Sequence, residues 1–373
     1  MGNQVFMQGN EAMAESAIRA GCKLFFGYPI TPSSEVPEYY ARAMRERPEE
    51  GITFIQAETE VAAFNMVAGA AATGHRSMTA TSGPGFSLGQ EALSYMSAAD
   101  LPAVIVEIMR AGPADGEILA AQGDYFQAVK GGGHGDYCNL VLAPYSVQEL
   151  CELMQESFEL AEKYRNPVIL LSDATIGKMR ESVELPGRPE LPVPAELPNA
   201  LRGCGMDKEP HKVITCGDGA VQWGAFNDRL QAKYQVIREN EERWESYNLE
   251  DADIILVAYG SMARVCVSAM NLARAEGIKV GMIRPISLWP FPQKAFAGIT
   301  GKKFLVCELS AGQMVEDVKL SVENKRDVSF FGKLGGTTPS PLSGDNWTVR
   351  HPFQGILLLL YTSAGFPDHR KKW

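Results

Sequence analysis

The sequence has few cysteines, and they are not arranged to hold a metal. They include no C-x-x-C pair and no histidine at a zinc-binding spacing, which argues against a zinc site or an iron–sulfur cluster held by this chain alone. An odd number of widely separated thiols is typical of reduced, mostly buried cysteines. The sequence therefore predicts no metal site. The seven cysteines are Cys22, Cys138, Cys151, Cys204, Cys216, Cys266 and Cys307.

Long apolar runs and basic clusters are also missing. The longest apolar run near the C-terminus covers only residues 356–361, far short of the roughly 20 residues of a membrane-spanning helix. The net charge is -10, and the longest Lys/Arg cluster is residues 370–372. Nucleic acid and anionic membranes are therefore poor partners. Because the N-terminus also lacks a basic-then-apolar signal pattern, we expect a cytoplasmic protein without membrane insertion.

Nucleotide-binding signatures are absent or incomplete. Gly217-Asp218-Gly219 is not followed by a third glycine at the dinucleotide spacing, and no G-x-x-x-x-G-K-[ST] occurs, so a Rossmann dehydrogenase and a P-loop enzyme are unsupported. The same residues mimic the opening of the magnesium motif of thiamine enzymes. However, the asparagines that would complete it, Asn240 and Asn248, fall in a charged segment rather than after a buried strand. We interpret the match as fortuitous.

What is present indicates an α/β fold. With 373 residues, 45% hydrophobic and 21% charged, the chain has room for two or three domains of about 150 residues. Strand-like and helix-like segments alternate, which favours a parallel sheet covered by helices. Five prolines between Pro186 and Pro198 then interrupt the pattern as a stiff linker or strap, before a second α/β unit. The predicted domains are residues 1–185 and 251–373, joined by a Pro-rich linker and charged helix at 186–250.

Hydrophobic periodicity and turn residues place the elements. Asn10 is expected to cap the first helix, and a further helix should begin near Ser87. Strands are expected at 23–26, 52–56, 77–81, 103–108, 167–171, 253–259, 279–283 and 303–307, and helices at 10–20, 59–74, 147–163, 225–249 and 260–277.

Three polar residues near the ends of predicted strands are candidates for chemistry. Glu60 opens an Ala-rich helix, where it is either a first-turn charge favoured by the helix dipole or a desolvated carboxylate that shares a proton with a ring nitrogen. Thr31 is expected to cap a helix with Pro32 at its first position, and a cap hydroxyl can also face a ligand. Arg110 leaves a strand beside a glycine and could clamp a carboxylate, or be only a surface arginine. His134, in a Gly-rich loop, lies either over a site or in a flexible turn.

Several long motifs, in this order, resemble the α subunit of the 2-oxoacid:ferredoxin oxidoreductases. Only about residues 185–250 fall outside the resemblance. The matching stretches are Gly27-Tyr28-Pro29-Ile30-Thr31-Pro32-Ser33-Ser34-Glu35, Gln56-Ala57-Glu58-Thr59-Glu60-Val61-Ala62-Ala63, Thr79-Ala80-Thr81-Ser82-Gly83-Pro84-Gly85-Phe86-Ser87-Leu88, Met109-Arg110-Ala111-Gly112-Pro113, Gln122-Gly123-Asp124-Tyr125, Ala258-Tyr259-Gly260-Ser261 and Arg284-Pro285-Ile286-Ser287-Leu288-Trp289-Pro290.

The resemblance implies a thiamine-diphosphate-binding domain of the pyrimidine type, followed by a domain similar to the C-terminal domain of transketolase. It implies that Glu60 hydrogen-bonds N1′ of the aminopyrimidine, that Thr31 lies near the substrate and that Arg110 binds the 2-oxoacid carboxylate. Tyr28, Pro29, Ile30 and Ser82 would contact the cofactor.

The resemblance also implies a mechanism divided among subunits. A β subunit would bind the diphosphate, Mg²⁺ and a [4Fe-4S] cluster, and a ferredoxin-like subunit, a γ subunit and ferredoxin itself are further expected partners. The expected reaction oxidises a 2-oxoacid with CoA to acyl-CoA and CO₂. The run from Asp124 to Tyr137 is most similar to the 2-oxoisovalerate type and second most similar to the 2-oxoglutarate type. An aryl 2-oxoacid is a third possible substrate. Two competing hypotheses are a self-contained thiamine enzyme and a non-catalytic scaffold subunit.

Overall fold

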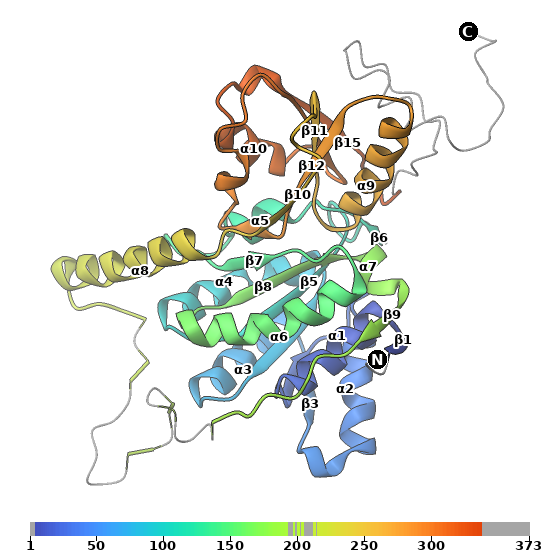
Figure 1. The fold of residues 1–373 in the computed structure, drawn as a ribbon. Coiled ribbons are helices and arrows are strands. Elements are labelled where there is room, and N and C mark those ends of the chain that lie inside the picture. The colour runs from blue at the N-terminus through green and yellow to red at the C-terminus, as the bar shows by residue number, and fades with distance from the viewer. Residues whose placement is uncertain are drawn as a thin grey trace.

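The structure is a computed structural model that describes residues 4–192, 197, 200–201, 203–204, 212–213 and 215–337. The Pro-rich segment lies partly outside the described residues, and the apolar run 356–361 and the basic cluster 370–372 lie wholly outside them. The described chain forms two α/β parts, each built around its own sheet, with the C-terminal sheet stacked above the N-terminal one in Figure 1. Within the described residues, no helix is long and apolar enough to cross a membrane.

The N-terminal sheet is the parallel sheet that the alternating pattern predicts. Among the described residues it has eight strands in the order β13-β7-β8-β5-β4-β2-β3, with β6 paired to β5 outside this path. Only β6 and β13 run antiparallel to their neighbours. The strands are β2 (Leu24–Gly27), β3 (Thr53–Gln56), β4 (Ser77–Thr81), β5 (Val104–Ala111), β6 (Glu117–Ala120), β7 (Leu140–Leu142), β8 (Val168–Asp173) and β13 (Ser287–Trp289).

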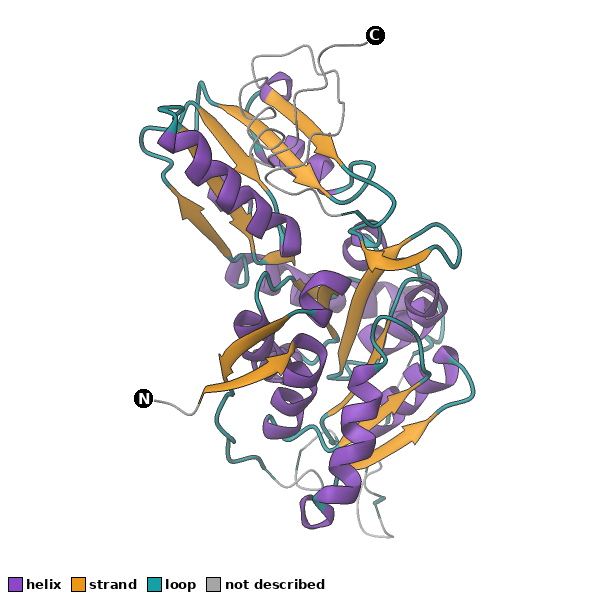
Figure 2. Cartoon of the chain, turned by 90° about the vertical axis from the view of Figure 1, so that its right-hand side faces the viewer, coloured by secondary structure: helices purple, strands orange, loops and turns teal. Residues whose placement is uncertain are grey.

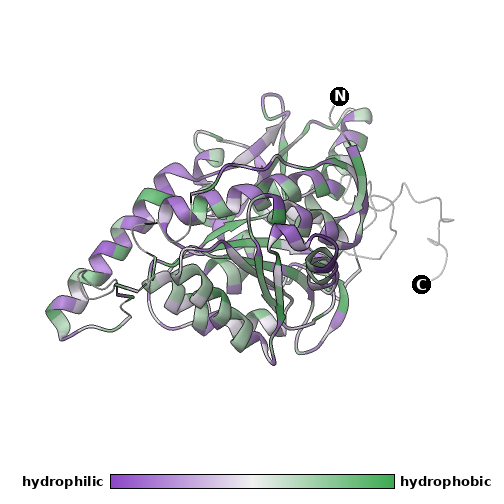
Figure 3. Cartoon of the chain, turned by 90° about the horizontal axis from the view of Figure 1, so that it is seen from below, coloured by the Kyte–Doolittle hydropathy of each residue, from purple (hydrophilic) through white to green (hydrophobic). Residues whose placement is uncertain are grey.

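Helices cover both faces of this sheet, so its central strands are buried on both sides. Along β5, Val104 and Val106 face the core under α1, α2 and α6, whereas Ile105 faces the core under α3 and α4. The outer helix faces in Figure 3 are correspondingly more hydrophilic than the central strands. The helices are α1 (Gly9–Arg19), α2 (Glu35–Glu46), η1 (Pro48–Glu50), α3 (Glu60–Ala72), α4 (Pro84–Ala98), α5 (Tyr125–Val129), α6 (Val147–Tyr164) and α7 (Ala174–Lys178).

The C-terminal sheet has the order β10-β12-β11-β14-β15 in the described chain. All its pairings are parallel except that of β10 with β12, and α9 packs against β11, β12 and β14. Its elements are β10 (Trp244–Tyr247), β11 (Ile254–Val257), α9 (Gly260–Ala275), β12 (Val280–Pro285), η3 (Gln293–Phe296), β14 (Lys303–Glu308), α10 (Met314–Ser321), η4 (Lys325–Asp327) and β15 (Val328–Gly332). The intervening β13 leaves this part and extends the N-terminal sheet.

Two sequence predictions near helix ends are wrong. Helix α1 begins at Gly9, so Asn10 is not its cap; its buried amide instead donates to the Pro32 carbonyl (2.7 Å) and to Glu35 (2.8 Å). The charged helix α8 (Ala220–Asn240) begins before residue 225 and ends before β10. It projects from the molecule in Figure 1, but Leu230, Tyr234 and Ile237 are buried against the N-terminal core. A separate two-stranded antiparallel sheet was not predicted. It pairs β1 (Gln4–Gln8) with β9 (Arg180–Glu184) and lies beside the N-terminus in Figure 2.

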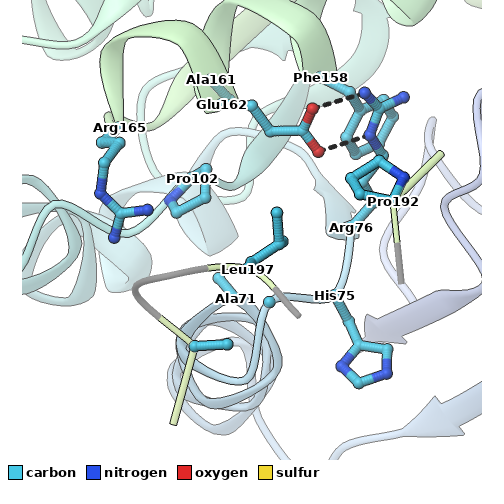
Figure 4. Close-up of a pocket in the computed structure, with 12 residues that line it drawn as sticks. Ala71, His75, Arg76, Pro102, Phe158, Ala161, Glu162, Arg165, Pro192 and Leu197 are labelled. Atoms are coloured by element: carbon cyan, nitrogen blue, oxygen red, sulfur yellow. Dashed lines mark hydrogen bonds and ion pairs between the residues drawn. The ribbon is translucent and has the colours of Figure 1, made fainter. Parts of the chain in front are cut away.

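The described part of the Pro-rich segment lies along the N-terminal part as a strap. Arg188 forms an ion pair with Glu50, and the Leu201 amide donates to the Ala72 carbonyl (2.8 Å). Pro192 and Leu197 close a pocket whose wall carries the ion pair of Arg76 and Glu162 (Figure 4). Arg76 directly precedes β4, so this pocket lies at the amino ends of the parallel strands, opposite the edge at which α/β sheets bind ligands.

A buried arginine joins the two parts. Arg284 on β12 is fully buried and binds both oxygens of Glu149 on α6 (2.9 and 2.8 Å). It also donates to Glu245 (3.0 Å) and lies 4.0 Å above the Tyr145 ring. Its removal would leave a largely buried carboxylate without its partner.

We therefore expect Arg284→Ala to destabilise the protein by about 3 kcal/mol, measured by denaturant unfolding. Arg274→Ala is the matched control, because its pair with Asp251 is solvent-exposed and should contribute far less to stability. Equal losses from the two substitutions would contradict the interpretation of Arg284 as a buried link.

Candidate functional site

The direction of chain connection reverses between β2 and β4. From β2 the chain goes to β3 on one side, then returns to β4 on the other side of β2. In open α/β sheets ligands bind beside the carboxyl ends of the strands at such a switch point. The segment Tyr28-Pro29-Ile30-Thr31 follows β2, and Ser82-Gly83 follows β4. The sheet topology therefore brings the predicted cofactor segments to one edge.

Glu60 reaches this edge from the start of α3. The Thr59 side chain caps the helix by accepting from the Ala62 amide (3.1 Å). Only 7% of Glu60 is exposed, and its carboxylate accepts no hydrogen bond from any residue that the structure describes. If Glu60 served only as a first-turn charge that the helix dipole favours, its side chain would be expected to point into solvent. The structure thus shows a sheltered carboxylate with open acceptor positions.

Gly85, in the first turn of α4, leaves the space that the Glu60 carboxylate occupies. A Cβ added at Gly85 would lie 2.7 Å from Glu60 Oε1 and 2.2 Å from Thr81 Oγ1. Both distances are shorter than real Cβ contacts, so the side chains would have to move. A glycine at this position is therefore required for Glu60 to lie against the N-terminus of α4.

If Glu60 is the reacting carboxylate that the resemblance implies, Gly85→Ala should lower catalytic turnover at least tenfold, because small displacements of a reacting group cost about this much or more. Gly69→Ala on the exposed side of α3 is the control, since nothing lies within 4 Å of its added Cβ; it should leave turnover unchanged and stabilise the helix slightly. The readouts are steady-state turnover and thermal unfolding. Full turnover in Gly85→Ala would show that the position of Glu60 tolerates this change.

Arg110 and Thr31, two of the candidates from the sequence, are in direct contact. Arg110 Nη1 donates to the Thr31 carbonyl at 2.8 Å, whereas its buried Nε has no acceptor among the described residues. The Arg110 side chain lies over Gly83: a Cβ there would be 3.6 Å from Arg110 Cγ. Strand β5 continues to Ala111, so Arg110 belongs to the strand rather than following it.

The predicted cap role of Thr31 is wrong. Helix α2 begins at Glu35, with Ser34 rather than Thr31 at its N-cap position. Residues 30–33 form a turn in which the Ser33 amide donates to the Ile30 carbonyl (3.0 Å), and Asn10 binds the Pro32 carbonyl. The Thr31 hydroxyl lies 3.3 Å from Ser34 Oγ. The Thr31 side chain therefore does not cap α2, and it can face a ligand.

The remaining cofactor candidates divide into exposed and buried groups. Tyr28 and Pro29 are exposed and Ile30 is partly exposed. Ser82 is fully buried, and its hydroxyl, like that of Thr81, has no hydrogen-bond partner in the described chain. Helix α4 begins at Pro84, directly after Gly83 and before the predicted start near Ser87. The unpartnered hydroxyls thus lie next to the N-terminus of α4.

His134 is exposed on a loop held against α4. Its carbonyl accepts from Ser94 (2.5 Å), and the Tyr137 hydroxyl binds the Gly133 amide (2.9 Å). Ser94 is on a later turn of α4 than Gly85, and no contact joins His134 to Glu60 or Arg110 in the described chain. The loop is therefore anchored, and the structure brings His134 into no group with the other candidates.

Two carboxyl groups at this edge were missed from the sequence. Glu107 is fully buried on β5 and accepts a hydrogen bond from the Gly83 amide at 2.7 Å. Burial and the neighbouring Asp124 carboxyl raise its pKa well above the ordinary value. Burial also raises the pKa of Asp124. The available signal was a lone carboxylate inside the apolar run Val104-Ile105-Val106-Glu107-Ile108.

Comparison with known proteins identifies the family of this chain. The family model "Pyruvate flavodoxin/ferredoxin oxidoreductase, thiamine diP-bdg" matches residues 15–232, and "Pyruvate:ferredoxin oxidoreductase core domain II" matches residues 252–343. The ketoisovalerate oxidoreductase subunit VorB of Methanothermobacter marburgensis is 49% identical over 88% of this chain and 93% of that protein. The 2-oxoglutarate synthase subunit KorA of Methanocaldococcus jannaschii is 38% identical over 90% and 96%.

Solved structures show the same fold. The 2-oxoglutarate:ferredoxin oxidoreductase from Magnetococcus marinus, solved with 2-oxoglutarate, coenzyme A and succinyl-CoA bound, aligns with a TM-score of 0.79 and 28% identity. The alignment covers 91% of this chain but 64% of that one. A split-gene transketolase, an inactive beta4 tetramer, aligns at a TM-score of 0.51 and 16% identity, and shares the fold alone. The predicted fold, a thiamine-diphosphate-binding domain followed by a transketolase-like α/β domain, is confirmed, and the chain belongs to the 2-oxoacid:ferredoxin oxidoreductase family.

Proposed function

We propose that this chain is the α subunit of a thiamine-diphosphate-dependent 2-oxoacid:ferredoxin oxidoreductase. The reaction would oxidise a 2-oxoacid with CoA to acyl-CoA and CO₂, and electrons would pass to clusters in partner subunits. One structural observation supports the proposal in addition to the sequence similarity. A buried carboxylate, Glu60, lies at the same edge of the N-terminal sheet as Arg110 and Thr31, beside the switch point between β2 and β4. A scaffold subunit would need neither the carboxylate nor the cation at this edge.

The residues at this edge fit the aminopyrimidine ring of thiamine diphosphate. Glu60 offers an open acceptor for a protonated ring nitrogen, and the Ser82 hydroxyl is a buried group that still lacks a partner within the described chain. Tyr28, Pro29 and Ile30 would form the side wall. When bound, the cofactor supplies a carbon nucleophile for the keto carbon and an acceptor for the electrons released with CO₂. Glu60 would hold the proton at the ring nitrogen that this chemistry requires.

Arg110 would bind the carboxylate of the 2-oxoacid. Its hydrogen bond to the Thr31 carbonyl uses one guanidinium nitrogen and orients the others, and a planar guanidinium can bind a carboxylate bidentately. Strand β6 pairs with β5 at Arg110 and exposes Ile118 and Leu119. These apolar side chains favour a branched-chain substrate such as 2-oxoisovalerate over 2-oxoglutarate, whose second carboxylate would call for another cation. An aryl 2-oxoacid is the third candidate substrate.

Partner subunits would complete the site. Apolar side chains are exposed around it, at Tyr28, Ile55, Val61 and Leu88, and a β subunit that covers them would supply the diphosphate site, Mg²⁺ and a [4Fe-4S] cluster. In the described residues there is no group of three or more His, Cys, Asp or Glu that could hold a metal. A ferredoxin-like subunit, a γ subunit and ferredoxin would carry the electrons further.

The test is to co-express this chain with its cysteine-rich partners under anaerobic conditions. We expect a brown complex that reduces a low-potential dye only when thiamine diphosphate, CoA and a 2-oxoacid are present, and fastest with 2-oxoisovalerate. Parallel assays with 2-oxoglutarate and phenylpyruvate rank the candidate substrates. A colourless, stable monomer that binds thiamine diphosphate and Mg²⁺ unaided would instead support a self-contained enzyme.

A further inference from the structure

A buried carboxyl pair lies directly behind Arg110, and the proposed reaction assigns it no role. Glu107 precedes Arg110 on β5 and is completely buried. Its Oε1 accepts from the Gly83 amide at 2.7 Å. Its Oε2 is buried and receives a hydrogen bond from no donor in the described chain. Burying an ionised carboxylate costs free energy when one of its oxygens accepts no hydrogen bond. A neighbouring group must therefore stabilise Oε2.

The Asp124 carboxyl is the group that faces it. Asp124 precedes α5, is mostly buried and also accepts from Gln127 Nε2 at 3.0 Å. Two ionised carboxylates are acceptors only, whereas a single retained proton turns one of them into a donor to the other. Burial, followed by the charge of Asp124, raises the pKa of Glu107 well above its usual range, and the Arg110 charge opposes this. Both shifts favour a state in which the pair keeps one proton and shares it.

Arg110 and Glu107 meet at the same residue, Gly83. A Cβ at Gly83 would be 3.7 Å from Arg110 Nε, and the same Gly83 amide binds Glu107. Nε of Arg110 is buried without an acceptor among the described residues, while Nη1 binds the Thr31 carbonyl. The charged groups facing Glu107 are Asp124, from the segment before α5, and Arg110, from its own strand; the β4–α4 turn contributes only the Gly83 amide.

We propose that Glu107 is a positioning residue, which shares one proton with Asp124 and thereby leaves Arg110 free to bind the 2-oxoacid carboxylate. This inference rests on the proposed function, in which Arg110 binds that carboxylate. When the shared proton is lost to solvent, the pair gains a second negative charge. That charge attracts the guanidinium through its unpartnered Nε and competes with both the Thr31 carbonyl and the substrate.

The test is the pH dependence of KM for the 2-oxoacid in the assembled complex. We expect KM of the wild type to rise about tenfold as the pH passes through the raised pKa of the pair, with a smaller change in kcat. Glu107→Gln keeps an acceptor for Gly83 and a donor for Asp124 but cannot titrate. It should retain a near-wild-type KM at neutral pH and lose the alkaline rise. Glu308→Gln is the matched control: Glu308 is a buried carboxyl of the C-terminal part that accepts from the Met314 and Val315 amides at the start of α10.

Thermal unfolding of the complex gives a readout independent of activity. Because the folded-state pKa of Glu107 is raised, its contribution to stability is present at pH values below the pKa of the unfolded chain and is lost as the pH rises through the folded pKa. Relative to the wild type, Glu107→Gln should therefore gain thermal stability as the pH increases. Asp124→Asn, which also removes the shared proton, should flatten the KM profile in the same way and replaces Glu107→Gln if that variant does not assemble.

The outcomes separate the two proposals. An alkaline rise in KM that persists unchanged in Glu107→Gln or Asp124→Asn overturns the role of the pair, even if Arg110→Lys still weakens 2-oxoacid binding. If Arg110→Lys leaves KM unchanged at every pH, the proposed role of Arg110 fails, and the inference fails with it. Both proposals are supported if the pH profile of KM is flattened in Glu107→Gln and Asp124→Asn while Glu308→Gln retains the alkaline rise in KM.

Discussion

Replacing Glu60 with alanine should lower turnover of the assembled complex by about 10²- to 10⁴-fold, the usual range for loss of a positioned proton-transfer group. Glu60 is 7% exposed and its carboxylate accepts from no donor among the described residues, so the fold does not depend on a hydrogen bond to it. We therefore expect thermal unfolding within a few degrees of the wild type. Dye reduction with saturating 2-oxoacid, CoA and thiamine diphosphate measures the effect.

Glu58 provides the matched control for this experiment. It lies just before the same helix but is exposed, so Glu58→Gln should keep wild-type turnover. Glu60→Gln retains the size of the side chain and loses only the charge, and should be nearly as inactive as Glu60→Ala. Near-normal turnover in Glu60→Gln, with wild-type turnover in Glu58→Gln, would remove Glu60 from the reaction.

Arg110→Ala should lower kcat/KM for the 2-oxoacid by about 100-fold, with most of the loss in KM. Truncating one partner of a desolvated charge pair costs about 2–5 kcal/mol, and each 1.4 kcal/mol is about tenfold in affinity. Arg110→Lys should recover only part of the loss, since an ammonium group cannot reproduce the bidentate geometry. The measurement is substrate-saturation kinetics at fixed CoA.

Arg229→Ala is the corresponding control, because Arg229 forms an exposed ion pair with Asp100 on the surface and should leave KM unchanged. The substrate series gives a second check. Because all the candidate 2-oxoacids present the same carboxylate to Arg110, Arg110→Ala should lower kcat/KM by a similar factor for each of them. A wild-type KM in Arg110→Ala would place the carboxylate-binding group elsewhere, in this chain or in a partner.

The order of elements was predictable because its signals are local. Buried parallel strands are short apolar runs bounded by turn residues, and helices carry apolar residues at helical spacing. Helix α6 with its Ser146 cap and strand β11 follow these rules closely. The errors occur where a polar side chain binds a distant partner. Asn10 binds the Pro32 carbonyl and Glu35 instead of capping α1, and this same contact holds the turn that separates Thr31 from α2.

The candidate site was predictable in part for a different reason. Thr31 and Glu60 follow β2 and β3, and Arg110 lies near the end of β5. The carboxyl ends of such parallel strands meet at one edge. Nothing local, however, indicates that Glu107 pairs with Asp124, because Asp124 comes from a separate loop. The same holds for β13, which belongs to the sequence of the C-terminal part but pairs with β7.

The fold class, the family and the residue types at the site follow from local periodicity and from motifs of fixed spacing, so they could be predicted without a structure. Three features became visible only in the folded chain: Gly85 makes room for Glu60, Arg110 binds the Thr31 carbonyl, and Arg284 links the two parts. These features depend on which distant side chains share a buried volume. Desolvation then sets their charges, and local spacing does not encode it.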